Sequence, residues 1–453
     1  MTDRQAKIVA NVEKYRDMIL EAERFIWTHP QVGYTEWEAH NYLKAKFEEL
    51  GYKLTEAGNI PGFYTDLDTG RPGPTLCIMG ELDALDIANH PDSVNGMNHS
   101  CGHNCQAAGM LGVAAGLSAP DALEGMCGKI RLMLVPAEEL IQIDFRESLR
   151  NEGKIHYFGG KPEFMYRGYF DDVDLCIMVH TGAEKTEKAF GCGRGNNGCI
   201  AKTFTFKGKS SHAGGSPNKG INAEYAAMLA LNACNALRET FPDADTIRFH
   251  PIVHGVNSAV NIIPDEMVCE SYVRGKSLTA IKRENEKMNR AITGAALSMG
   301  AKVTLCDRPG YTPELHDLQF MQLVEQCCKD LVGEEQVEFN YERFGTGSSD
   351  FGDLTAVMPG VQFRAYGASG RAHGIDYFIT DPVKACVNPA KAQIFVADAL
   401  LSNGAEKAKA IIDAYEPQFK SIQEYIDCMD SLILDKDAVQ YDENGNVTID
   451  YKN

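Results

Sequence analysis

The chain has 453 residues, of which 44% are apolar, and this is enough for a large core spread over roughly two to four domains. It carries 44 Lys and Arg residues against 63 Asp and Glu residues, a formal net charge of −19 that argues against nucleic acids and anionic membranes as partners. Fourteen cysteines at irregular spacings, no cleavable leader and no apolar run of the roughly 18 residues that a membrane span needs predict a cytoplasmic protein.

The first two predicted elements are helices of the scaffold. Residues 6–28 and 36–50 place apolar residues at helical spacing and charged residues on the outer face. His29 precedes a proline in the turn between them, and this context favours a structural role for the histidine.

The next stretch combines a buried strand with candidate metal ligands. The apolar run TLCIMG at 75–80 is typical of a strand that is covered on both faces of a parallel sheet. Cys101 and His103 then precede an Ala-, Gly- and Met-rich segment at 104–118, which is predicted to be a buried helix. A helix N-terminus lowers the pKa of a thiol, and a thiolate two residues from an imidazole suits a zinc-like ion.

Three further apolar runs end in residues of the same chemical kind. KIRLMLV at 129–135 leads to Glu138 and Glu139, DLCIMV at 174–179 leads to His180, and a run at 361–365 leads to a loop with His373. Adjacent carboxylates at a strand end are costly unless a cation holds them, so one is expected to bind metal while the other acts as a base. Parallel strands place these groups at one edge of the sheet, where open α/β sheets build their sites.

Other interpretations of the cysteine cluster remain. A structural zinc knot would need Cys-x-x-Cys pairs, and the second pair is absent. Cys101 could act as a nucleophile with His103 as its base, or the cysteines could be buried and inert. Four ligand clusters at equivalent strand ends favour the metal site over each of these alternatives.

A second domain is predicted within the first. The glycines of GCGRGNNG at 191–198 are followed by a strand-like pattern, so they are interpreted as a hinge and not as a nucleotide loop. The segments after the hinge follow the order β-α-β-β-α-β of a ferredoxin-like domain. This insert contains His212, Asn261 and Arg274, which together could bind a carboxylate or an oxyanion.

The predicted domain boundaries follow from these patterns. Residues 1–195 and 309–403 form the catalytic domain, and residues 196–308 form the inserted domain. Residues 404–453 form a helical and acidic C-terminal extension, for which the sequence predicts no chemistry.

Six segments, in this order, resemble a known family. They are HSCGHNCQAAGMLG, VPAEE, VHTG, GKSSHAGGSPNKGINA, NIIPDEMVCESYVRG and SSDFGD. The chain is similar over residues 10–403 to the amidohydrolase branch of the dinuclear metallopeptidases, which are related to aminoacylase and glutamate carboxypeptidase. That branch includes hippurate hydrolases and auxin–amino acid hydrolases, but GELDAL and CGHN resemble the aminobenzoyl-glutamate hydrolase type most.

The resemblance implies an α/β fold: a mixed-sheet, zinc-peptidase-like catalytic domain with the insert as a lid and dimerisation domain. It implies two divalent ions per subunit, Zn²⁺ or Mn²⁺, and a homodimer. Glu138 matches the general base, Asp83 the residue that orients a ligand, and His212 the lid histidine that reaches the partner subunit's site. Asn261 and Arg274 match the residues that hold the substrate's carboxylate. The matching metal ligands are Cys101, His103, Glu139, His180 and His373.

Three positions depart from the family pattern: Asp86 replaces a proline, Gln106 replaces a histidine of the hippurate type, and His373 has an unusual context. They bear on substrate choice more than on metal binding.

The expected function is that of a metal-dependent amidohydrolase or metallopeptidase. It would hydrolyse the amide bond of an N-acyl amino acid, an aminobenzoyl-glutamate-like compound or a dipeptide and release a free amino acid. The alternatives are a non-catalytic metal-binding interaction protein of the same fold and an acyltransferase that uses Cys101. The presence of Glu138, His212 and Arg274 together favours the hydrolase.

Overall fold

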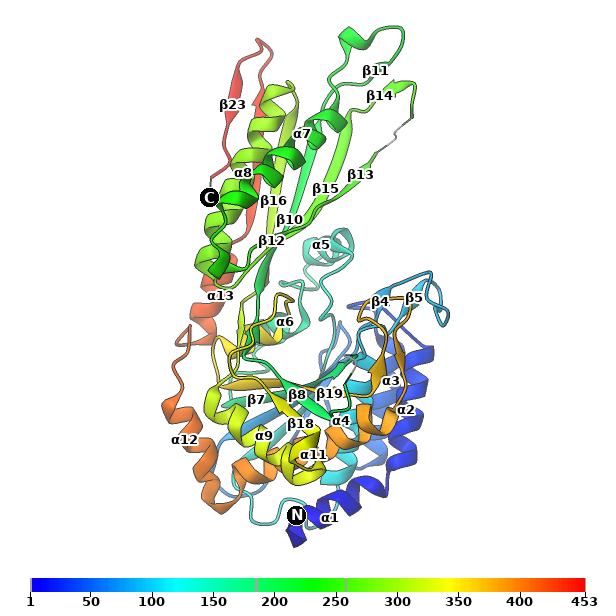
Figure 1. Cartoon of the computed structure of the whole chain (residues 1–453), viewed down its shortest axis with the longest axis vertical. Helices are drawn as coiled ribbons and strands as arrows, with labels where there is room; N and C mark the ends of the chain where they lie inside the picture. Colours follow the sequence, from blue (N-terminus) through cyan, green and yellow to red (C-terminus); the bar gives the residue numbers. More distant parts are fainter. Residues whose placement is uncertain (1, 184–185, 257–258, 453) are drawn as a thin grey trace. The chain divides into compact units, whose positions relative to one another are not determined.

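The computed structural model describes residues 2–183, 186–256 and 259–452, which fold into two compact units (Figure 1). The first unit comprises Met1–Gly195, Glu314–Gly345 and Ser349–Ile422. The second comprises Asn196–Pro313, Thr346–Ser348 and Gln423–Asn453. The segment predicted as a separate extension, 404–453, is therefore divided between the two units.

A mixed sheet of eight strands forms the centre of the first unit. The four central strands β6, β3, β7 and β19 are mutually parallel, whereas β2 is antiparallel to β6 and β8 is antiparallel to β19. The mixed α/β fold predicted from the sequence is confirmed. The strands in sheet order are β1 (Thr55–Glu56), β2 (Phe63–Asp68), β6 (Lys129–Val135), β3 (Thr75–Glu81), β7 (Leu175–Gly182), β19 (Gly360–Tyr366), β8 (Phe190–Cys192) and β18 (Val337–Phe339).

Short strand pairs and helices surround this sheet. The predicted helix over 6–28 is interrupted at Lys14 and Tyr15 and forms two helices. The helices are α1 (Asp3–Glu13), α2 (Arg16–Thr28), α3 (Trp37–Glu49), α4 (His103–Leu117), α5 (Ile143–Asn151), α6 (Gly160–Tyr166), α9 (Leu318–Val332), α10 (Phe351–Thr355), α11 (Asn388–Leu401) and α12 (Glu406–Ala414). The short pairs are β4 (Leu85–Asp86) with β5 (Met97–Asn98), β9 (Gly195–Asn196) with β17 (Glu314–Leu315), and β20 (Ala368–Ser369) with β21 (Phe378–Ile379).

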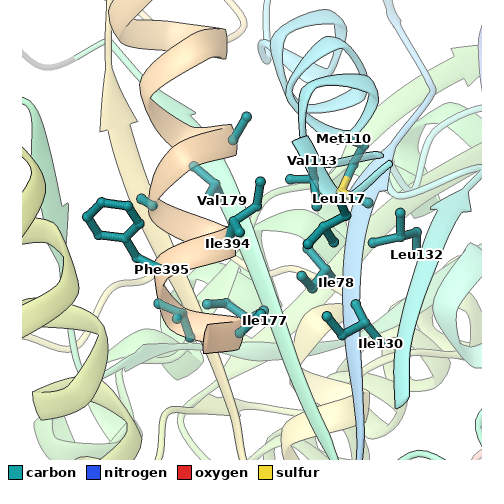
Figure 2. Packing of buried hydrophobic residues seen from close by; sticks show 14 of the residues in the cluster. Ile78, Met110, Val113, Leu117, Ile130, Leu132, Ile177, Val179, Ile394 and Phe395 are labelled. Atoms are coloured by element: carbon teal, nitrogen blue, oxygen red, sulfur yellow. The ribbon is translucent and has the colours of Figure 1, made fainter. Parts of the chain in front are cut away.

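Helix α4 is buried along its whole length. Its small residues allow close packing: a Cβ atom added at Gly112 would lie 2.8 Å from side-chain atoms of both Ala390 and Ile19. Figure 2 shows Met110, Val113 and Leu117 of α4 among the buried residues that cover the sheet. Because α4 is fixed from all sides, the residues at its N-terminus are held in place as well.

The second unit is an antiparallel sheet with two long helices. Its order along the chain is strand, helix, strands, helix, strand, followed by a C-terminal hairpin that pairs with β16 and adds two strands to the sheet. The elements are β10 (Gly198–Lys207), β11 (Ser211–His212), α7 (Ala223–Ala236), β12 (Arg248–Phe249), β13 (Ile252–Gly255), β14 (Ile262–Ile263), β15 (Glu266–Gly275), α8 (Leu278–Ser298), β16 (Lys302–Tyr311), α13 (Ile422–Asp430), β22 (Leu434–Tyr441) and β23 (Val447–Ile449).

Single helical turns complete the two units. The turns of 3-10 type are Pro217–Lys219, Leu237–Thr240, Asp243–Asp245, Glu334–Gln336 and Asn403–Ala405, and Val383–Val387 forms a π-helical turn. Among the residues that the structure describes, no helix is both long enough and apolar enough to cross a membrane.

Candidate metal centre

The four parallel strands of the first unit bring the predicted ligands to one edge of the sheet. In the register of β3 and β6, Glu81 lies opposite Val135, so the segments that follow both strands leave the sheet side by side. β7 is the next neighbour of β3 and carries His180 near its end, and β19 pairs with β7. The parallel arrangement of these strands thus assembles the site.

Two groups of potential donor atoms meet at Cys101. Its sulfur lies within 4.8 Å of donor atoms of His103 and His180, and also within 4.8 Å of donor atoms of Glu139 and His373. Cys101 Sγ is 3.4 Å from His180 Nε2, and His373 Nε2 is 3.2 Å from Glu139 Oε1. One buried cysteine therefore belongs to both groups and could contribute a ligand to each of two ions.

Three residues in or next to the ligand-bearing segments have positive φ angles: Gly102, Ala137 and His373. Gly102, between Cys101 and His103, has φ +87°, and a Cβ atom there would lie 2.4 Å from Tyr377 Oη. Ala137 and His373 have φ values of +59° and +62°, which are unfavourable for residues with a side chain. Strained residues of this kind are concentrated at functional sites, where the surrounding structure holds them in place.

Asp83 links two ligand-bearing segments by contacting His103 and the backbone of Glu139. Its Oδ1 atom lies 3.1 Å from His103 Nδ1, its carbonyl oxygen lies 2.9 Å from the same nitrogen, and its Oδ2 atom accepts a hydrogen bond from the Glu139 backbone at 2.7 Å. Donation from His103 Nδ1 to Asp83 leaves His103 Nε2 as a lone-pair donor to a metal ion. Asp83 thus contacts both His103 and the segment that carries Glu139.

Two buried atoms in the centre lack hydrogen-bond partners among the described residues: His103 Nε2 and Glu139 Oε1. Buried polar atoms are nearly always satisfied, so unpartnered acceptors in both donor groups indicate positions for cations. Sulfur, imidazole nitrogen and carboxylate oxygen are the donors that zinc-like ions use. The residues of the centre therefore fit a pair of divalent ions.

The pKa shifts of Cys101, Glu138 and Glu139 are compatible with a bound cation. Burial alone would raise the pKa of the Cys101 thiol, but the neighbouring His103 and His180 outweigh it and hold the pKa well below its usual range. Burial and the Cys101 charge raise the pKa of Glu139 to about 7. Burial, together with the carboxylates of Glu81 and Glu139, raises the pKa of Glu138 well above its usual range. A cation in the centre would favour the charged forms of all three groups.

Glu138 stands apart from the two donor groups that contain Cys101. It is 7% exposed, and its Oε2 atom lies 3.9 Å from His103 Nε2. A carboxylate at this position is close enough to exchange a proton with a reactant held in the centre.

Several further buried residues lie around the centre. Lys161 and Asp350 are fully buried and bind each other, and Lys161 also binds Glu81. His99 is 1% exposed, and its ring nitrogens have no hydrogen-bond partner among the described residues. Arg146 donates to the carbonyl oxygen of Phe158 at 2.5 Å and to that of Glu139. The segment SSDFGD, which carries the family resemblance, was the one available signal for Asp350, and no sequence pattern singles out Lys161.

The remaining predicted residues belong to the second unit. His212 on β11 is exposed, and its Nδ1 atom accepts hydrogen bonds from the backbones of Gly214 and Gly215 at 3.1 and 2.9 Å. These bonds place the proton on Nε2. The carbonyl oxygen of Asn261 accepts from Ala213, so Asn261 lies next to His212.

Arg274 lies on β15, apart from this pair of strands. Its Nη1 atom donates to Ser348 Oγ at 3.2 Å, and its guanidinium lies 5.0 Å from the ring centroid of Tyr272. The structure thus brings His212 and Asn261 together, and it places Arg274 with Ser348 and Tyr272.

Comparisons with known proteins agree with this architecture. Residues 77–392 match the sequence model of peptidase family M20/M25/M40. The chain is 31% identical over 262 residues to an indole-3-acetyl-aspartic acid hydrolase of Enterobacter agglomerans, a stretch that covers 55% of each chain. It is 30% identical over 259 residues to one of the subunits of the p-aminobenzoyl-glutamate hydrolase of Escherichia coli K12, covering 54% of this chain and 55% of that one. The chain therefore spans about half the length of these two relatives.

A solved structure shows the same fold. It is a Bacillus subtilis protein described as a dinuclear metal-binding peptidase of the M20 family, with a TM-score of 0.63 at 19% sequence identity. The similarity covers 86% of this chain and 99% of that chain.

The two cysteines near the start of α4 should respond differently to substitution. Cys101→Ser should lower metal affinity at least about tenfold, because a hydroxyl is a poorer ligand than a thiolate. Cys105 lies within α4, is fully buried and contacts Cys386, so Cys105→Ser should leave metal affinity unchanged. Metal content after dialysis against a chelator series measures both. Equal losses in the two variants would show that Cys101 is not the bound cysteine.

Proposed function

Because the chain belongs to peptidase family M20/M25/M40, we propose that it releases a free amino acid from an N-acyl amino acid, an aminobenzoyl-glutamate-like compound or a dipeptide. The chain is a metal-dependent amidohydrolase. The observation that carries the proposal is the pair of donor groups that share Cys101, next to the buried carboxylate of Glu138. The names of both curated relatives point to substrates whose leaving group is an acidic amino acid.

The proposed centre holds two divalent ions, Zn²⁺ or Mn²⁺. Cys101, His103 and His180 would hold one ion, and Cys101, Glu139 and His373 the other. When bound, the ions polarise the substrate carbonyl and make the attacking water acidic enough to react near neutral pH. Asp83 keeps the proton of His103 on Nδ1, so that Nε2 stays available as a ligand.

Glu138 would move the proton that the reaction requires. Its carboxylate takes a proton from the attacking water and later passes it to the nitrogen of the leaving amino acid. A protein that only bound metal would have no use for a carboxylate that is buried beside the ions at a high electrostatic cost. The position of Glu138 therefore favours the hydrolase over a non-catalytic metal-binding protein of the same fold.

The second unit would supply further contacts with the substrate. His212 presents an Nε2–H group, because its Nδ1 atom is occupied by two backbone donors, and such a group can stabilise a developing oxyanion. Arg274 and Asn261 would bind the carboxylate of the leaving amino acid.

We further propose a homodimer in which His212 of one subunit serves the metal centre of the other. The second unit exposes apolar side chains on α7, where Tyr225, Met228 and Leu229 are 58%, 52% and 40% exposed. Strand β13 exposes Ile252 and Val253 and pairs with β15. An exposed apolar helix face next to an accessible strand edge is suited to pairing with a second copy of the chain.

All fourteen cysteines are free thiols, which supports the proposed cytoplasmic location.

A panel of substrates tests the proposed reaction. N-acyl aspartates and glutamates, aminobenzoyl-glutamate, other N-acyl amino acids and dipeptides would be incubated with the protein, and free amino acid would be measured. We expect hydrolysis of at least one class, loss of activity with a chelator and recovery with Zn²⁺ or Mn²⁺. Two bound ions without hydrolysis of any compound would indicate a non-catalytic protein.

The two adjacent glutamates should separate catalysis from metal binding. Glu138→Gln should keep both ions but lose roughly 10²- to 10⁴-fold in turnover, since the base is removed. Glu139→Ala should lose ions as well as activity. Metal analysis and initial rates on the same preparations distinguish the two. Turnover close to wild type in Glu138→Gln would refute its assignment as the base.

Complementation tests the shared site. His212→Ala and Glu138→Gln homodimers should each be nearly inactive. After joint unfolding and refolding, about half the dimers should be mixed and should contain one site with both defects and one intact site, so about a quarter of wild-type activity should return. No recovery in verified mixed dimers would mean that His212 does not act across subunits.

A further inference from the structure

A buried group of charges lies next to the donor atoms of the metal centre. Lys161 Nζ contacts Glu81 Oε1 at 2.5 Å and also binds Asp350. The Lys161 backbone donates to Asp350 Oδ2 at 3.0 Å. All three side chains are fully buried. Burial of three charges is costly, so an arrangement of this kind needs a reason beyond stability.

The second carboxylate oxygen of Glu81 faces the metal centre. Glu81 Oε2 accepts a hydrogen bond from Gln106 Nε2 at 2.7 Å and lies 3.2 Å from His103 Nε2. This second contact is an ion pair only when the His103 ring is doubly protonated; otherwise His103 Nε2 has no hydrogen-bond partner among the described residues. The ring proton of His103 is engaged on Nδ1 by Asp83. A lone pair of His103 and a carboxylate oxygen of Glu81 are therefore directed at each other.

With the His103 proton on Nδ1, these two acceptors repel each other unless a proton or a metal ion lies between them. Nitrogen and oxygen donors bind a zinc-like ion at about 2.1 Å, so two donors of one ion lie roughly 3 Å apart. The 3.2 Å between Glu81 Oε2 and His103 Nε2 matches that spacing. Glu81, His103 and Glu138 form a third group whose donor atoms lie within 4.8 Å of one another.

We propose that Glu81 is a further donor to the ion that His103 binds, and that Lys161 and Asp350 are positioning residues for Glu81. Lys161 engages Oε1 of Glu81, so Oε2 is directed toward His103. Gln106 fixes the same oxygen from the side of α4. This inference rests on one part of the proposed function, namely that the centre binds metal ions. A carboxylate oxygen is a harder ligand, in the chemical sense, than sulfur or imidazole nitrogen. Adding it gives a ligand set that suits Mn²⁺ as well as Zn²⁺.

Two substitutions at Glu81 test the proposal. Glu81→Gln removes the charge and keeps the shape, whereas Glu81→Asp keeps the charge and withdraws it by one methylene group. The control is Glu23→Gln, because Glu23 is also buried and binds α4 through Asn104, at 2.8 Å. Ions per chain and their affinities would be measured by dialysis against a graded chelator series, with thermal unfolding of the metal-free proteins as a check on folding.

We expect both Glu81 variants to lose one of the two ions first, with at least about a tenfold loss in its affinity, while the other ion and the Glu23→Gln control remain like wild type. The visible spectrum of the Co²⁺-loaded Glu81→Gln protein should also change. Lys161→Met should weaken the same ion and spare the other. Wild-type affinities for two ions in both Glu81 variants would overturn the proposal and leave the proposed hydrolase intact. A wild-type protein that binds no ions would overturn both.

Discussion

The structure depends on one buried thiolate that two donor groups share. Cys101 must lie near His180 on β7 and also near Glu139, which follows β6. This is possible because β3, β6 and β7 are parallel neighbours and α4 begins directly beside their ends. The left-handed conformation of Gly102 directs the chain from Cys101 into α4, and the nearby Tyr377 excludes a side chain at that position. The fold thus serves to keep a small set of donor atoms at fixed distances.

Bringing these donor atoms together also buries several negative charges close to one another. Five carboxylates, all less than a tenth exposed, belong to the donor groups or to the buried contacts beside them: Glu81, Asp83, Glu138, Glu139 and Asp350. Lys161 and Arg146 supply the fixed positive charges of this region, and both are almost completely buried. Burial first, and neighbouring negative charges second, raise the pKa values of Glu138 and Glu139. Two divalent ions held by the donor groups would supply positive charge here, so metal binding should stabilise the first unit.

Much of this could be predicted from the sequence, for identifiable reasons. Strands β3 and β7 contain continuous apolar runs, and β6 and β19 are largely apolar, so their ends and the ligands beyond them were apparent without a structure. The contact between Lys161 and Glu81 joins residues 80 positions apart, and no periodicity or motif marks it. The break at Lys14 and Tyr15 was missed because apolar spacing continues across it. The acidic tail pairs with β16 as β22, an assignment that depends on a tertiary partner and not on local pattern.

Direct observation of the ions in a crystal of the metal-loaded protein tests the central claim most directly. Anomalous diffraction at the metal absorption edge would locate each ion and identify the atoms around it. The account predicts two ions per chain, with the sulfur of Cys101 bound to both of them. A single ion, or two ions of which one has no sulfur ligand, would contradict it.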